Sequence, residues 1–66
     1  MRYKELTKKL KRLGCEYVRQ GSGSHEIWKN ERTQGVTVIP RHNKEIATGT
    51  LHKILKDLGF SRKDLQ

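Results

Sequence analysis

Two short stripes of apolar residues with the period of a helix lie at the two ends of this chain, and three β-prone runs lie between them. In the first stripe Leu6, Leu10 and Leu13 follow one another at i, i+4 and i+7, and Tyr3 lies on the same side three residues earlier. This spacing puts apolar side chains on one face of an α-helix. It predicts an amphipathic helix over Tyr3–Leu13.

The second helical stripe follows Thr48, whose hydroxyl is of the kind that caps a helix N-terminus. Gly59 is a typical stop signal at the other end. Beyond it, Ser61 and Asp64 have the spacing of a capping pair for a final short turn. The apolar members of this predicted helix are Leu51, Ile54, Leu55 and Leu58.

The three runs between the helices predict an antiparallel meander. They are Cys15–Gln20, His25–Lys29 and Val36–Pro40, separated by a small-residue turn and a polar turn. Pro40 suits the end of a strand because proline cannot donate to a ladder. We therefore expect an α+β fold of α-β-β-β-α order, with two helices covering one face of a three-stranded sheet, and a single domain over residues 1–66.

Charge restricts the partners of so short a chain. Fifteen Lys and Arg against seven Asp and Glu give a net charge of +8 over 66 residues. Such an excess is typical of proteins that bind polyanions, of which nucleic acid is the usual one, and the equally open alternative is a solubilising surface. Binding to a membrane surface is disfavoured, because the basic helix offers only leucines that a small core needs. A core this small also suggests help from a partner or from self-association.

Cysteine and histidine content disfavours two further classes of protein. Cys15 is the only cysteine, so no internal disulfide can form and nothing indicates secretion. The three histidines lack the close spacing of a zinc site, and no cofactor is expected. No apolar run is long enough for a membrane span, which makes the cytoplasm the default compartment.

The stretch with the clearest chemistry is Gly23-Ser24-His25, at the junction of the first turn with a strand. Imidazole exchanges a proton near neutral pH, and this junction holds it beside open loop backbone. The alternation of side chains along the strand does not decide which way the imidazole points. His25 shares one face with Ile27, and Glu26 shares the other face with Trp28. If Trp28 packs beneath the helices, His25 looks out from the open face of the sheet; if Ile27 does, His25 lies at the rim of the core.

The element order, charge and length resemble the double-stranded-RNA-binding fold. The segments 23–25, 38–42 and 49–61, in unbroken order, resemble the HicA family of bacterial toxins over nearly the whole chain. That resemblance implies an mRNA interferase of a type II toxin–antitoxin pair, neutralised by a HicB antitoxin. It also implies that His25 is the catalytic residue.

RNA carries its own nucleophile, the 2′-hydroxyl, so a nuclease needs a proton acceptor, a proton donor and cationic stabilisation of the transition state. We expect His25 to supply proton transfer, as base or acid, without a metal; its alternative is a structural turn histidine. We expect substrate contacts from the neighbouring turn and from the basic loop after the third strand. The alternative for the first turn is that its residues only serve the geometry of the hairpin, and the alternative for the basic loop is that it is a solvated turn. These candidates are Gly23, Ser24, Arg41, His42 and Lys44.

Three further assignments stay open at this point. His42 is the second candidate for proton transfer, whereas His52 is expected to be exposed on the second helix. Trp28 either stacks on an RNA base or belongs to the core. The rival function is a module that binds double-stranded RNA through its shape and phosphates without cutting it.

Overall fold

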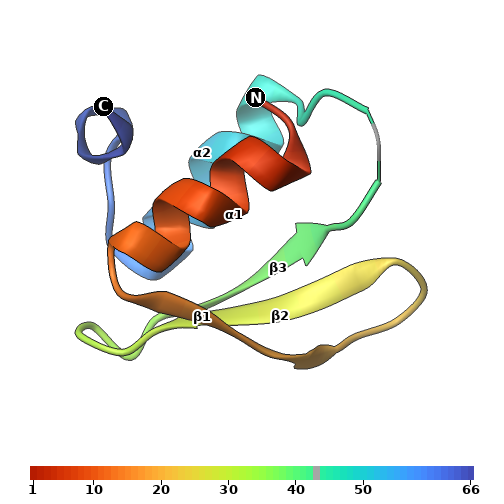
Figure 1. The fold of residues 1–66 in the computed structure, drawn as a ribbon, viewed down its shortest axis with the longest axis horizontal. Helices are drawn as coiled ribbons and strands as arrows, with labels where there is room; N and C mark the ends of the chain where they lie inside the picture. Colours follow the sequence, from red (N-terminus) through yellow and green to blue (C-terminus); the bar gives the residue numbers. More distant parts are fainter. Residues whose placement is uncertain (43) are drawn as a thin grey trace.

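The computed structural model describes residues 1–42 and 44–66. Asn43, within the expected basic loop, lies outside the described residues. The elements follow the predicted α-β-β-β-α order, with a short 3₁₀ helix after them (Figure 1). They are α1 (Tyr3–Arg12), β1 (Cys15–Gln20), β2 (His25–Asn30), β3 (Val36–Pro40), α2 (Thr48–Leu58) and η1 (Arg62–Leu65).

α1 buries the predicted stripe. Leu6 and Leu10 have no exposed surface, and Leu13 is half-buried at the C-cap. The helix ends one residue earlier than predicted, because the backbone leaves the helical region at Leu13. Gly14 then takes a left-handed conformation with φ of +94°, which glycine adopts without strain.

The three strands form an antiparallel meander in the order β1-β2-β3. In the centre, Trp28 of β2 pairs with Tyr17 of β1 and with Thr37 of β3. The pairing shifts between Tyr17 and Arg19, which leaves one extra residue in β1 as a bulge. The predicted sheet topology is therefore confirmed.

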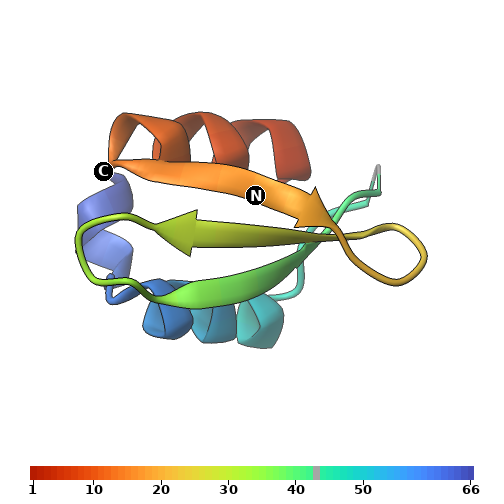
Figure 2. The same ribbon diagram turned by 90° about the horizontal axis from the view of Figure 1, so that it is seen from below.

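Both helices cover one face of this sheet, α1 on the β1 side and α2 on the β3 side (Figure 2). Along β2 the side chains of Glu26, Trp28 and Asn30 are buried towards the helices, and His25 is exposed. Strand alternation therefore puts His25 and Ile27 on the uncovered face. Of the two directions left open by the sequence, the one with Trp28 in the core is correct.

α2 begins at Thr48, but Thr48 is not its N-cap. The N-cap is Ala47, whose backbone is extended and whose carbonyl accepts a hydrogen bond from the N–H of Leu51 at 2.9 Å. The reason lies outside the local sequence: the N–H of Ile46 is held by the carbonyl of Met1, 2.9 Å away, which fixes how the chain enters the helix. At the other end Gly59 is the predicted left-handed cap, with φ of +82°.

The end of α2 is tied to the turn between β2 and β3. The amide Nδ2 of Asn30 and the hydroxyl of Thr33 donate to the carbonyl of Leu58, at 2.8 and 3.1 Å. Beyond it, the Ser61 N–H donates to the Asp64 carboxylate at 2.7 Å, as the capping pair predicted. The buried apolar core consists of Leu6, Leu10, Cys15, Trp28, Ile39, Ile46, Leu51, Ile54, Leu55, Leu58 and Leu65. No helix in the described ranges is both long and apolar enough to cross a membrane.

Candidate active site

His25 opens β2 at the end of the sheet that carries the first turn. Its backbone N–H donates to the carbonyl of Ser22 at 3.1 Å, and its carbonyl accepts from Gly21 at 2.8 Å. Gly23, with φ of +58°, supplies the left-handed backbone that this turn requires. The main chain of His25 is thus fixed on both sides, while its side chain is exposed. Within residues 1–42 and 44–66, no hydrogen bond or ion pair engages the imidazole.

A buried carboxylate lies behind His25, on the other face of the sheet. Glu26 is 3% exposed, and its Oε1 accepts hydrogen bonds from the Tyr3 hydroxyl at 2.6 Å and from Trp28 Nε1 at 3.0 Å. Its Oε2 lies 3.8 Å from Nε of Arg41. Burial, followed by the hydrogen bond to Glu26, raises the pKa of Tyr3 to about 12. Tyr3 therefore stays protonated and donating at any ordinary pH.

Arg41 joins the end of β3 to this cluster. Its backbone N–H donates to the carbonyl of Ser24 at 2.8 Å, so the first turn and the start of the basic loop are bonded directly. Its guanidinium turns towards the helices, with Cζ 5.9 Å from the centre of the Tyr3 ring. The imidazole of His25 and the guanidinium of Arg41 therefore lie at one end of the sheet but on opposite faces.

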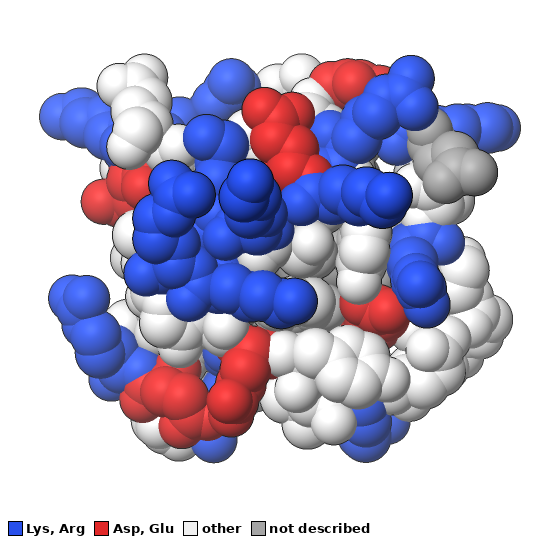
Figure 3. Space-filling view, in the orientation of Figure 1, with Lys and Arg blue, Asp and Glu red and all other residues white. Residues whose placement is uncertain are grey.

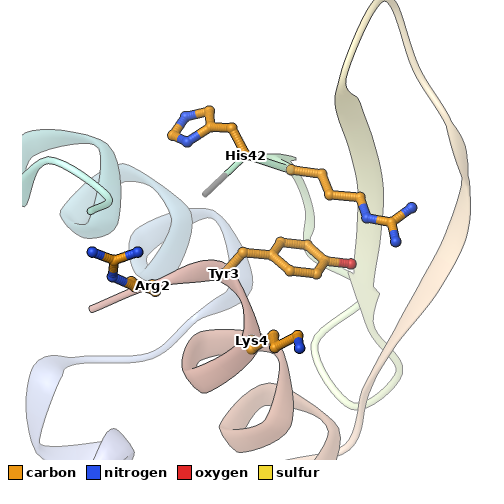
Figure 4. Close-up of a pocket in the computed structure, with 5 residues that line it drawn as sticks. Arg2, Tyr3, Lys4 and His42 are labelled. Carbon is orange, nitrogen blue, oxygen red and sulfur yellow. The ribbon is translucent and has the colours of Figure 1, made fainter. Parts of the chain in front are cut away.

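A pocket of about 520 Å³ opens on the helix side of that end. Figure 4 shows the Tyr3 ring in its middle, with Arg2, Lys4 and His42 around it. Arg41 completes the lining. We call these five residues the N-terminal pocket.

His42 and Lys44 are both exposed. The backbone N–H of Lys44 donates a hydrogen bond to Nδ1 of His42 at 3.3 Å. His42 faces the N-terminal pocket, which His25 does not line. The two histidines are therefore not a pair on one surface.

The site residues predicted from sequence thus fall into two groups. Gly23, Ser24 and His25 belong to the turn, and Arg41, His42 and Lys44 belong to the basic loop. Of the basic-loop residues, Arg41 and His42 line the pocket and Lys44 does not. The hydrogen bond from Arg41 to Ser24 connects the groups through the backbone. Among the described residues no side-chain bond joins His25 to the basic loop.

Four residues that the sequence did not single out belong to this end of the molecule. Arg2 and Lys4 line the N-terminal pocket, Tyr3 is its floor, and Glu26 anchors Tyr3. One signal was available: Glu26 lies two residues before Trp28 on the same face of a strand, so burying the indole also buries a carboxylate that needs donors. His52 is exposed on α2, as predicted. In the described part of the chain no group of three or more His, Cys, Asp or Glu is placed to hold a metal ion.

Comparison with known families agrees with this fold. A family model described as HicA toxin of bacterial toxin–antitoxin systems matches residues 3–60, which is most of the chain. The matched segment spans α1 to the residue after Gly59 and so includes both the turn with His25 and the N-terminal pocket apart from Arg2. No individual curated protein is similar enough to this chain to count as a relative.

Proposed function

The chain belongs to the HicA family of bacterial toxins, and we propose that it is an mRNA endoribonuclease whose proton-transfer group is the imidazole of His25. One observation carries this proposal. His25 is held by its backbone at a strand end, while its side chain is exposed and not engaged by any described residue. A turn histidine with a structural role would instead use a ring nitrogen to hold a neighbouring residue.

The reaction needs no nucleophile from the protein. The 2′-oxygen attacks the adjacent phosphorus, an O–P bond forms, and the bond from phosphorus to the 5′-oxygen breaks. The proton of the 2′-hydroxyl is lost to a base, and the departing 5′-oxygen gains a proton from an acid. His25 serves one of these two roles and water at the open face serves the other. The products are a 2′,3′-cyclic phosphate and a 5′-hydroxyl, and no metal takes part.

The predicted substrate contacts have separate roles in this scheme. Gly23 and Ser24 lie beside the imidazole and offer backbone N–H groups or a hydroxyl to the phosphate that is cut. Arg41, His42 and Lys44 bind phosphates further along the RNA. His42 is a weaker candidate for proton transfer than the sequence alone indicated, because it faces the N-terminal pocket.

Cleavage of a labelled mRNA in EDTA tests this function. Wild-type protein should cut and leave cyclic or 3′-phosphate ends, and His25→Ala should not cut, with a loss of at least about a hundredfold as expected for a general acid or base. His52→Ala is the matched control, since His52 is an exposed histidine on α2. Circular dichroism should show the same fold for all three proteins.

Two other outcomes would count against the proposal. Cleavage by His25→Ala would mean that another group transfers the proton, and His42 would be the next residue to change. RNA binding without cleavage by any of the proteins would favour the rival function, a double-stranded-RNA-binding module, which the α-β-β-β-α fold would equally suit.

A toxin of a toxin–antitoxin system has an antitoxin partner, and we propose that this partner is a HicB-type protein that covers the uncovered face of the sheet. This face carries His25 and, in β3, Val36 and Val38, whose exposed fractions are 52% and 45%. Half-exposed valines on the same face as the imidazole suit contact with a protein partner, and a partner bound there would cover His25. Wild-type toxin expressed alone should stop growth, whereas co-expression with the antitoxin, or His25→Ala alone, should not.

A further inference from the structure

The N-terminal pocket is a basic cavity on the face of the sheet opposite His25. It lies where the start of α1 meets the chain that leaves β3, and it is open to solvent (Figure 4). Three of its five lining residues, Arg2, Lys4 and Arg41, carry a positive charge. The proposed function gives Arg41 and His42 a role in binding RNA phosphates, but it leaves Arg2, Tyr3 and Lys4 in this cavity of about 520 Å³ without one.

The carboxylates nearest the pocket do not line it. Glu26 lies beneath the pocket, and its Oε1 already accepts from two donors. Glu45 forms an ion pair with the terminal amine of Met1. Glu5, in the first turn of α1, is exposed and does not line the cavity. An anion entering the pocket therefore meets a lining that contains basic side chains and no carboxylate.

Arg41 is also held in place before any ligand arrives. Glu26 attracts its Nε at 3.8 Å, the Tyr3 ring lies beneath its guanidinium at 5.9 Å, and Ser24 fixes its backbone. Only Nε faces the carboxylate, so the terminal nitrogens keep their donors for another acceptor. A guanidinium held in this way loses less conformational entropy when it binds a phosphate.

We propose that the N-terminal pocket binds a phosphate of the same RNA strand that His25 cuts, at least one nucleotide away from the cleaved bond. This inference rests on the proposed function. The pocket and the imidazole flank one end of the sheet from opposite faces, and the bond from Arg41 to Ser24 runs between them. An RNA strand that reaches both must bend around this end. A flexible single strand can do so, whereas the regular backbone of a duplex cannot reach both faces.

Binding is measured first, in a background that cannot cut. Protein with His25→Ala is titrated against a fluorescent single-stranded RNA of twelve nucleotides. Adding Lys4→Gln or Arg41→Gln should weaken binding about fivefold, as loss of one charged phosphate contact does. Lys8→Gln is the matched control, because Lys8 lies one turn further along α1, is exposed and does not line the pocket. It should change the affinity less than twofold.

Cleavage kinetics then separate this pocket from the phosphate that is cut. Protein that retains His25 is given two substrates. A dinucleoside monophosphate contains only the scissile phosphate, whereas the twelve-nucleotide RNA also reaches the pocket. Lys4→Gln should raise KM for the long substrate about fivefold relative to KM for the short one, with kcat moved much less. An equal rise for both substrates would overturn the proposal, because the pocket would then act on the scissile phosphate itself.

The binding and cleavage experiments also distinguish an error in the pocket proposal from an error in the nuclease proposal. If Lys4→Gln and Lys8→Gln weaken RNA binding equally, the pocket is only part of a diffuse basic surface and the proposal is wrong, whatever the protein cuts. If the protein cuts nothing but Lys4→Gln still weakens binding selectively, the pocket binds RNA phosphate and the nuclease assignment fails instead. Tighter binding to a duplex of equal length than to the single strand would overturn the single-strand geometry.

Discussion

At the scale of single residues, Glu26 organises the end of the sheet that carries His25 and the N-terminal pocket. A carboxylate that is 3% exposed needs donors, and it takes them from α1, from its own strand and from the chain after β3. The same contacts keep Tyr3 and Arg41 on the helix side. Strand alternation then puts His25, its neighbour in sequence, on the uncovered face.

The first prediction concerns the hydroxyl of Tyr3. The chain has two tyrosines, so Tyr17→Phe leaves Tyr3 as the only group that gives a tyrosinate signal. Its titration by ultraviolet absorbance should have a midpoint at about 12 and not at the ordinary 10.0, because burial and the bond to Glu26 favour the neutral form. Adding Glu26→Gln should lower this midpoint.

The sign of the accompanying stability change follows from linkage. Because the pKa is raised in the folded state, the folded protein keeps a proton that the unfolded chain releases above pH 10.0. This contribution to the free energy of unfolding is complete below pH 10 and declines as the pH rises towards 12. A midpoint near 10 in the Tyr17→Phe protein would contradict the hydrogen bond from Tyr3 to Glu26.

At the scale of elements, periodicity predicted every helix and strand to within about a residue, because each apolar stripe fits only one period. It did not predict which face of β2 is buried, since Ile27 and Trp28 offer an apolar residue to either side. The choice depends on Tyr3, 23 residues away from Glu26, which supplies the donor that makes burial of Glu26 and Trp28 acceptable. The N-cap of α2 was missed for the same kind of reason, a long-range bond from Ile46 to Met1.

The candidate site also combines a part that is local in sequence with a part that depends on long-range packing. The turn with His25 is local in sequence, and its motif identified it. The N-terminal pocket is not local, since it joins the first residues of the chain to residues 41 and 42. No spacing rule connects Lys4 with Arg41. Only the fold, with α1 packed across the sheet, shows that their charges converge.

The second prediction tests how closely α2 packs on the turn between β2 and β3. A Cβ at Gly35 would overlap the carbonyl oxygen of Asp57 and lie 3.2 Å from Cα of Leu58. Both are backbone atoms of α2, so Gly35→Ala must push the helix away from the turn. We expect a loss of about 1–3 kcal/mol in the free energy of unfolding, measured by urea denaturation.

Gly49 provides the matched substitution in the first turn of α2. A Cβ there meets nothing within 4 Å, so Gly49→Ala should be neutral or stabilise the protein by up to about 1 kcal/mol through helix propensity. Equal effects of the two substitutions would show that α2 does not lie as close to the turn as this packing requires.

At the scale of the whole molecule, the two faces of the sheet differ in kind. The helix side carries the cations of α1, which gather on the face drawn in Figure 3, and it holds the N-terminal pocket. The uncovered face instead presents half-exposed valines of β3 on the same side of the sheet as His25. The cations of α1 and of the N-terminal pocket therefore lie away from the surface proposed for the antitoxin. The two proposals together predict that RNA and antitoxin compete at the end of the sheet and not across the whole molecule.

This division makes the salt dependence of RNA binding the last prediction. If the three cations of the N-terminal pocket and Lys44 each meet a phosphate, the logarithm of the association constant should fall against the logarithm of KCl concentration with a slope of about −3, at roughly −0.7 per contact on a single strand. Fluorescence anisotropy on the His25→Ala protein measures it without cleavage. Lys4→Gln should flatten the slope by about 0.7, and Lys8→Gln should leave it almost unchanged.

A slope near zero would mean that stacking or base contacts, and not phosphates, dominate RNA binding. Equal flattening by both variants would mean that the whole cationic face of α1 binds RNA, and that the pocket has no special place in it.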